Sequence, residues 1–192
     1  MPRNQHRYND LTDAGLRVLA REGARGLTHR AVDAESDVPP GTTSNYFRTR
    51  EELLDALGKR IFTLLAPTPE VIESRADREP SIALYVEYVQ DIVARVRAQP
   101  SLSLALMELR LESTRYPDLA RTLGEILRRN FAADVAFSEQ RGMPGGQREV
   151  MLLHFAIDGL VLDLLTASIG LAEDEVDAVV ADLVTRIVGG SS

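Results

Sequence analysis

The 192-residue chain is 44% apolar, which suits one medium-sized domain or a small domain joined to a larger one. It contains no cysteine, which excludes disulfides and thiolate metal sites and fits a reducing cytoplasm. The formal net charge of −7 is unevenly spread, because residues 1–60 hold ten Lys/Arg and nine Asp/Glu whereas the rest holds 12 and 20. A near-neutral N-terminal part on an acidic body suits a small nucleic-acid-reading head, although charge alone decides little.

The chain begins with a polar segment, MPRNQHRYND, which predicts no secretory signal peptide. No apolar run reaches membrane-spanning length, so we expect a cytoplasmic protein with no membrane partner. Arg7–Glu22 carries leucine, alanine and valine at the three-, four- and seven-residue spacing of an amphipathic helix. We expect this first helix to pack behind the next two helices and to hold them rigid.

The stretch Gly26–Leu54 predicts two short helices, a tight turn and the start of a longer helix. Thr28 is a suitable N-cap for a first short helix over Thr28–Ser36. Asp37 tolerates the left-handed backbone that ends a helix, and Pro39 cannot continue one. These residues therefore predict a sharp turn between the two short helices.

The second short helix is predicted to start near Pro40, a residue suited to a first helical turn. Thr49 and Glu52 then form a capping box for a long helix over Arg50–Leu65. Threonine and serine are weak helix formers, so propensity does not explain the polar surface of the second short helix. That surface consists of Thr42, Thr43, Ser44 and Asn45.

A helix that enters the DNA major groove would explain this polar surface. Threonine methyl groups can contact the thymine methyl group, hydroxyls can bond to base edges, and asparagine can pair with adenine. The alternative is an ordinary polar turn between two helices. That alternative leaves the neighbouring aromatic and basic residues without a role, namely Tyr46, Phe47, Arg48 and Arg50.

The same stretch resembles the DNA-binding domain of the tetracycline-repressor (TetR) family of bacterial regulators. The family pattern runs through a leucine–threonine pair, an alanine-rich helix, Ala-Gly-Val, a short helix of the Gly-Thr-Leu-Tyr kind ending in Phe, and Ser-Lys-Glu-x-Leu. The residues that fall on it in register are Leu27, Thr28, Val38, Gly41, Thr42, Phe47, Thr49, Arg50, Glu51, Glu52 and Leu53. The motif-level match covers about residues 8 to 60, and beyond it only the helical layout is similar.

The chain departs from the family pattern at three places. Asp37 stands where the family usually has glycine, Thr43 and Ser44 stand where it has Leu-Tyr, and Arg50 stands where it has lysine. These departures affect which contacts and which operator sequence to expect, but not the fold. The resemblance implies a double-stranded, palindromic DNA operator, with Thr42, Thr43 and Asn45 facing base edges. The full set of predicted DNA contacts is Thr28, His29, Arg30, Pro40, Thr42, Thr43, Ser44, Asn45, Tyr46 and Arg50.

The rest of the chain also reads as helical. Three prolines and several charges in Ala66–Pro80 predict a loop, and no strand pattern or repeat occurs anywhere. We therefore predict an all-α fold of about nine helices, with a helix-turn-helix domain over residues 1–49 and a ligand-binding and dimerisation domain over residues 50–192. The helices expected after this loop are Ser81–Ala98, Ser101–Thr114, Pro117–Gln140, Gln147–Ser168 and Glu173–Val188.

The body offers little for catalysis. It has no cysteine and no glycine-rich phosphate loop, and the three histidines of the chain are scattered. His154 and Asp158 could form a His–Asp pair that acts as a general base in catalysis, but such pairs are more often local hydrogen bonds. We expect no enzyme, no metal and no cofactor. The resemblance implies instead a pocket for an unidentified small-molecule effector, with candidate lining residues Tyr85, Tyr88, Met107, Phe131, His154, Phe155 and Asp158.

The last two helices suggest self-association. Gln147–Ser168 is apolar on more than one face, and its small residues would allow another helix to approach closely. TetR-like proteins dimerise through a four-helix bundle, and two-fold symmetry lets two recognition helices read two half-sites. The alternative is that both helices are buried within a monomer. The predicted interface residues are Ala156, Gly159, Leu162, Val180 and Val184.

Three functions are compatible with the sequence. The leading one is a homodimeric repressor that a small ligand releases from its operator. The second is an activator or a co-repressor-dependent regulator with the same contacts. The third is a helical enzyme or scaffold with a vestigial DNA-binding head, which salt-sensitive, operator-specific DNA binding would exclude.

Overall fold

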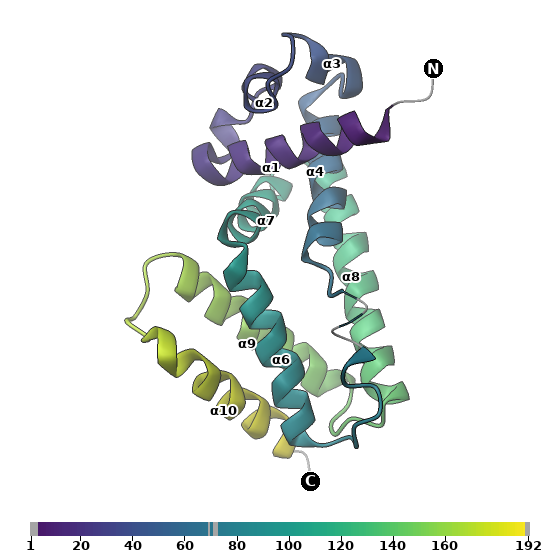
Figure 1. Ribbon diagram of the computed structural model, residues 1–192, viewed down its shortest axis with the longest axis vertical. Helices are drawn as coiled ribbons and strands as arrows, with labels where there is room; N and C mark the ends of the chain where they lie inside the picture. The colour runs from purple at the N-terminus through teal and green to yellow at the C-terminus, as the bar shows by residue number, and fades with distance from the viewer. Residues whose placement is uncertain (1–3, 69, 71–72, 191–192) are drawn as a thin grey trace. The chain divides into compact units, whose positions relative to one another are not determined.

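The computed structural model describes residues 4–68, 70 and 73–190, and all the regular structure within this part of the chain is helical (Figure 1). This confirms the predicted all-α fold. None of the described helices is both long and apolar enough to cross a membrane. The elements in these residues are α1 (Gln5–Gly26), α2 (His29–Glu35), α3 (Thr42–Tyr46), α4 (Arg50–Leu65), α6 (Ile82–Ala98), α7 (Pro100–Ser113), α8 (Pro117–Gln140), α9 (Gln147–Leu165), a 3₁₀ turn η1 (Glu173–Glu175) and α10 (Val176–Gly189).

Helix α1 is longer than predicted at both ends. Its N-terminus is capped by Asn4, whose side-chain oxygen accepts hydrogen bonds from the backbone N–H groups of His6 at 3.0 Å and Arg7 at 3.3 Å. Gly23 has φ 66°, a left-handed value that kinks the helix before its last residue, Gly26. The predicted end at Glu22 is therefore the position of this kink.

The two short helices and their turn largely follow the sequence. The Thr28 side chain accepts a hydrogen bond from the N–H of Ala31, which confirms it as the N-cap of α2. Asp37 has φ 51° and confirms the left-handed turn. The predicted start of α3 near Pro40 is wrong, because Gly41 has φ 90° and helical geometry begins only after it.

Helices α4 and α8 begin and end where the sequence predicts, and the other C-terminal elements differ slightly. Pro100 is the first residue of α7 rather than a break before it. Helix α9 ends at Leu165 and not at Ser168. The acidic segment Glu173–Glu175 forms a 3₁₀ turn, so α10 starts at Val176.

The described chain forms two compact units of packing. Unit 1 comprises Met1–Ala66 and Gln99–Leu127, and unit 2 comprises Pro67–Ala98 and Arg128–Ser192. Helix α7 and the first half of α8 therefore pack with α1–α4. These units are defined by packing, whereas the predicted domains, residues 1–49 and 50–192, are defined by function. That functional division stays a prediction.

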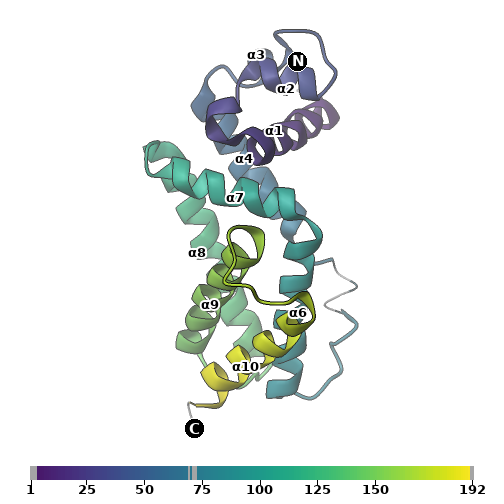
Figure 2. The same ribbon diagram turned by 90° about the vertical axis from the view of Figure 1, so that its left-hand side faces the viewer.

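The core of unit 1 lies where α1 meets α2, α4 and α7. Gly15 allows α1 to approach α4 closely, because a Cβ atom there would lie 2.8 Å from a methyl carbon of Leu57. Helix α1 packs against α2 (Figure 2), and Tyr8 of α1 reaches Phe47 at the end of α3, as expected for a support. The fully buried large side chains of this core are Leu11, Leu16, Val18, Leu19, Leu27, Leu53, Leu54, Leu57, Ile61, Leu109 and Leu119.

The core of unit 2 forms where α10 packs on α6 and α9 (Figure 2). Four valines at four-residue spacing, Val176, Val180, Val184 and Val188, are at most 4% exposed and meet Val93 and Leu153. The prediction that Val180 and Val184 lie at a dimer interface is therefore wrong. Both side chains are fully covered by the same chain, so neither of them presents surface to a second copy.

Candidate nucleic-acid interface

The outward surface of α3 is small and polar. Ser44 and Asn45 are exposed, and Thr42 is half-buried. The hydroxyls of Thr42 and Ser44 donate back to the carbonyl oxygens of Pro39 at 2.6 Å and Gly41 at 2.9 Å, which stiffens the turn. The Asn45 amide makes no hydrogen bond within the described part of the chain, so both its donor and its acceptor are available to a base edge.

Thr43 corrects the predicted reading surface. Its side chain is fully buried, and its hydroxyl donates to Oδ1 of Asp33 at 2.5 Å. The helix turns about 100° per residue, so four consecutive polar residues cannot all face outward, and one of them must face the protein. Thr43 is that residue and cannot reach a base edge.

Helix α2 supplies the other predicted contacts beside α3. Thr28 and Arg30 are exposed, and so is Pro40 on the turn. His29 is half-buried, and its Nε2 lies 2.7 Å from the carbonyl oxygen of Phe47. That contact ties the start of α2 to the residue that ends α3, so one ring nitrogen of His29 is already engaged within the protein.

The end of α3 is anchored by aromatic side chains. Phe47 is 2% exposed, and its ring centroid lies 5.2 Å from that of Tyr8 in α1 and 6.3 Å from that of Tyr46. These tilted contacts are typical of stabilising aromatic pairs. They hold the last turn of α3 against the first part of α1.

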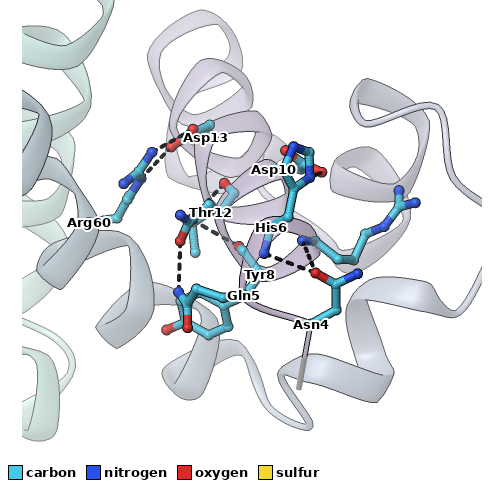
Figure 3. A network of polar contacts seen from close by, with 10 residues as sticks. Asn4, Gln5, His6, Tyr8, Asp10, Thr12, Asp13 and Arg60 are labelled. Atoms are coloured by element: carbon cyan, nitrogen blue, oxygen red, sulfur yellow. Dashed lines mark hydrogen bonds and ion pairs between the residues drawn. The ribbon is translucent and has the colours of Figure 1, made fainter. Parts of the chain in front are cut away.

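Polar contacts fix α1 as a frame for this surface (Figure 3). Arg60 of α4 donates to both carboxylate oxygens of Asp13 in α1, at 2.7 and 2.9 Å, and these bonds raise the pKa of the guanidinium. Nearer the N-terminus, His6 Nδ1 lies 2.8 Å from Oδ2 of Asp10, and the Thr12 hydroxyl donates to backbone carbonyls one turn earlier. The sequence did not predict these contacts of Arg60, Asp13, His6, Asp10 and Thr12.

Arg50 was predicted to contact DNA, and the structure gives it a different position. Its guanidinium donates to the carbonyl oxygens of Ala24 and Leu27, beyond the kink of α1. It also lies 3.7 Å from a carboxylate oxygen of Glu112 in α7, and Glu108 of α7 accepts a hydrogen bond from the Ala24 N–H at 3.2 Å. Arg50 therefore holds the junction of α1 and α2 together, and its guanidinium is engaged within the protein.

The predicted ligand-pocket residues are only partly brought together. Nε2 of His154 lies 3.0 Å from Oδ2 of Asp134, and that hydrogen bond raises the pKa of His154 despite partial burial. The ring of Phe131 meets His154 edge-on, with centroids 5.5 Å apart. Phe155 is 66% exposed and Asp158 is also exposed, so both point outward from α9 in the single chain.

The tyrosines of α6 face α8 within unit 2. Tyr88 packs edge-on against Phe137, with ring centroids 5.3 Å apart. Tyr85 is half-buried and hydrogen-bonded to Ser138, and burial raises its pKa. Met107 belongs to α7 and hence to unit 1. The pocket as a whole stays a prediction.

An apolar face of α9 is left uncovered within the described chain. Its exposed large side chains are Met151, Leu152, Phe155 and Leu162, which are 38–66% exposed. A Cβ atom added at Gly159 would meet nothing within 4 Å, and Ala156 is half-buried. Contiguous apolar surface of this kind on one helix is typical of a protein-contacting face.

Two further features bear on a possible metal or ligand site. Among the described residues, no group of three or more histidines, aspartates and glutamates is arranged to hold a metal ion. A cleft of about 590 Å³ lies in unit 1 around the Arg50 junction, and its carboxylates, Glu22, Glu108 and Glu112, are paired with Arg21, the Ala24 N–H, Arg50 and Arg115.

Two family profiles match the sequence. Residues 11–57 match the profile described as "Bacterial regulatory proteins, tetR family", and residues 80–190 match "Tetracyclin repressor-like, C-terminal domain". The second match alone spans more than half of the chain. The sequence matches no curated protein.

Solved structures of similar fold cover nearly the whole chain. The multidrug binding protein EbrR complexed with imidazole is 23% identical, with a TM-score of 0.70, and the match covers 95% of this chain and 94% of that one. The complex of EbrR with ethidium is 21% identical, with a TM-score of 0.71 and coverage of 98% and 100%. A transcriptional regulator from Rhodococcus sp. Rha1 is 18% identical, with a TM-score of 0.74 and coverage of 95% and 96%.

Proposed function

Because the chain belongs to the tetracycline-repressor family of bacterial regulatory proteins, and is thus a DNA-binding transcriptional regulator, we propose that it is a homodimeric repressor that a small ligand releases from its operator. The observation that carries the proposal is α3, a five-residue helix that presents Ser44 and Asn45 to the outside. Its other sides are held by α2 and by the aromatic anchor at Phe47. Such a rigid, small and polar surface suits base reading in the major groove.

The direct test is a binding selection with purified protein and fragments of genomic DNA. We expect enrichment of a palindromic site, with an affinity that falls as salt concentration rises, because phosphate contacts release counterions. The position of that site would also indicate the regulated genes. Equal binding to all fragments, or none, would favour the vestigial-head alternative.

Asn45→Ala is expected to weaken binding to the cognate operator by about 1–3 kcal/mol and to relax specificity at one base pair, as loss of an amide contact to a base does. Binding to random DNA should change little. A titration of operator and random duplexes at fixed salt measures both quantities. Gln140→Ala, the same kind of truncation at an exposed position in unit 2, serves as the control. Unchanged operator affinity in Asn45→Ala would contradict the assigned reading surface.

The dimer is supported by the uncovered apolar face of α9. Leucine, methionine and phenylalanine side chains there would be removed from water if a second copy of the same helix packed on them. Gly159 would let two helices approach closely, because no side chain fills the space above it. Helix α10 contributes to such a bundle only through its polar and half-buried positions, since its valines are already covered.

The effector is proposed to be an apolar molecule that is neutral or cationic. Residues 61–192 hold 12 basic and 20 acidic side chains, which disfavours a polyanion. Phe131 and His154 form an edge-on pair, whose Phe131 ring offers an aromatic wall to such a molecule. The complexes of EbrR with ethidium and proflavin support the same chemical class by analogy.

Phe131→Ala is expected to reduce the response to an effector while leaving operator affinity unchanged. The effector must favour the released state by about 1.4 kcal/mol for each tenfold loss of operator affinity. A lipophilic cation that does not intercalate, such as tetraphenylphosphonium, and a panel of neutral apolar compounds can be ranked by thermal shift and then by operator release. Phe62→Ala, which truncates a half-buried phenylalanine of unit 1, is the matched control. A compound that binds tightly yet leaves DNA affinity unchanged at saturation would contradict the coupling, and a compound that strengthens operator binding would favour the co-repressor alternative.

A further inference from the structure

The recognition helix α3 has no cap of its own. Its N-cap residue is Gly41, which has φ 90° and no side chain to accept a hydrogen bond. The first N–H groups of a helix have no partner within the helix, so they need one from outside. A helix of only five residues has few internal bonds to compensate, and its direction depends on that outside partner.

Asp33 of α2 supplies this partner. Its Oδ2 accepts a hydrogen bond from the Gly41 N–H at 2.7 Å. Its Oδ1 accepts two more, from the Thr43 N–H at 2.7 Å and from the Thr43 hydroxyl at 2.5 Å. One carboxylate thus holds three donors at the start of α3, from a position eight to ten residues earlier in the chain.

The carboxylate is almost completely removed from water. Asp33 is 3% exposed and Thr43 is fully buried, with Val32 and Phe47 also buried in the same core. A buried charge is tolerated only when its oxygens are well bonded, and bonds from N–H groups to a carboxylate are stronger and more directional than neutral ones. These hydrogen bonds are short and buried and involve both carboxylate oxygens of Asp33. Helix α3 therefore has little freedom to rotate or slide on α2.

We propose that Asp33 is a positioning residue for operator recognition, which fixes the angle at which α3 presents Asn45 to the bases. This proposal rests on the DNA-reading function proposed above. Asp33 ties the start of α3 to α2, as the His29 contact ties its end, so that α2 and α3 form one rigid body. Removing one acceptor from that side chain should therefore alter the choice of DNA sequence more than the non-specific attraction to DNA.

Asp33→Asn keeps the size of the side chain but turns one acceptor oxygen into an NH₂ group, which then faces a backbone N–H. We expect the ratio of operator to random-DNA affinity to fall by about tenfold or more, whereas random-DNA affinity changes no more than in the control. The control is Asp37→Asn, which removes the same charge from an exposed position on the adjoining turn, where asparagine also tolerates φ 51°. Thr43→Val, which removes only one of the three bonds, should give a smaller fall in the same ratio.

Hydrogen exchange separates this proposal from the function on which it rests. In the wild-type protein without DNA, the Gly41 and Thr43 amides should exchange slowly, although neither is bonded within α3. They should exchange faster in Asp33→Asn and at the wild-type rate in Asp37→Asn, whereas Thr43→Val keeps both amide bonds and should change their exchange less. A wild-type protein with no operator preference would contradict the proposed function. The exchange result would then still test whether Asp33 caps the start of α3. An unchanged affinity ratio in folded Asp33→Asn, or fast exchange of both amides in the wild type, would overturn the positioning role.

Discussion

Leu162→Arg is expected to yield a folded monomer whose affinity for a palindromic operator is lower by roughly 10²–10⁴-fold, because a monomer engages one half-site and loses the effective concentration of a linked second head. Leu162 is 50% exposed on the uncovered apolar face of α9, so an arginine there has access to water in the single chain. In a symmetric pair, two such arginines would be brought together and partly dehydrated. Sedimentation velocity and operator titration measure the two effects.

The variant has two useful controls. Leu162→Met keeps the apolar surface and should stay dimeric. Leu111→Arg places the same charge on another exposed leucine, 60% exposed on α7, and should also stay dimeric. A wild-type protein that sediments as a monomer at micromolar concentration would contradict the dimer and the palindromic operator together.

Val180→Arg is expected to destabilise the fold itself. The Val180 side chain is fully buried in the apolar cluster that α10 forms with α6 and α9, where an arginine would displace apolar side chains. Burying an unpaired charge costs about 3–5 kcal/mol, by comparison with broken buried ion pairs. For a chain of this size that corresponds to a fall in melting temperature of about 6–20 °C.

Calorimetry or circular dichroism on heating measures this change, with Thr185→Arg on the exposed side of α10 as the control. The comparison with Leu162→Arg is informative, since both variants would lower operator binding but for different reasons. The Leu162→Arg monomer should unfold at the same temperature as a monomer of the wild-type protein. Val180→Arg should unfold at a lower temperature. A Val180→Arg protein that melts like the wild type would contradict the buried position of α10.

Where a helix has a strong start signal, the sequence predicts its bounds well, whereas a long apolar pattern alone leaves the ends of α1 and α9 off by up to four residues. Arg50–Leu65 and Pro117–Gln140 have strong start and stop signals, a capping box in the first case and a leading proline in the second. The start of α3 was harder to predict. Pro40 is suited to a first turn, but the left-handed backbone at Gly41 moves the start of the helix by two residues, and the partner of the Gly41 N–H, Asp33, lies eight residues earlier in the chain.

The site was predictable in its location but not in the role of each side chain. Thr42, Thr43, Ser44 and Asn45 are alike in polarity, and a five-residue helix is too short for its periodicity to show which one is buried. The partner of Thr43 lies ten residues earlier, and no local pattern marks Asp33 as an acceptor. Similarly, the four-residue spacing of the valines in α10 predicts an apolar stripe but not whether the same chain or a second copy covers it.

The junction around Arg50 has a consequence for the order in which the chain can fold during synthesis. The Ala24 N–H receives its hydrogen-bond partner, Glu108, from 84 residues further along the chain, and the core beneath α1 is completed only by Leu109, Leu119 and Leu123. The N-terminal helices therefore leave the ribosome before the side chains that cover them exist. Unit 1 can close only after α7 and the first half of α8 have emerged, when Pro67–Ala98 of unit 2 is already outside. A fragment that stops at the loop after α4 would leave apolar side chains of α1 and α4 uncovered, whereas one that ends at residue 127 contains the whole of unit 1.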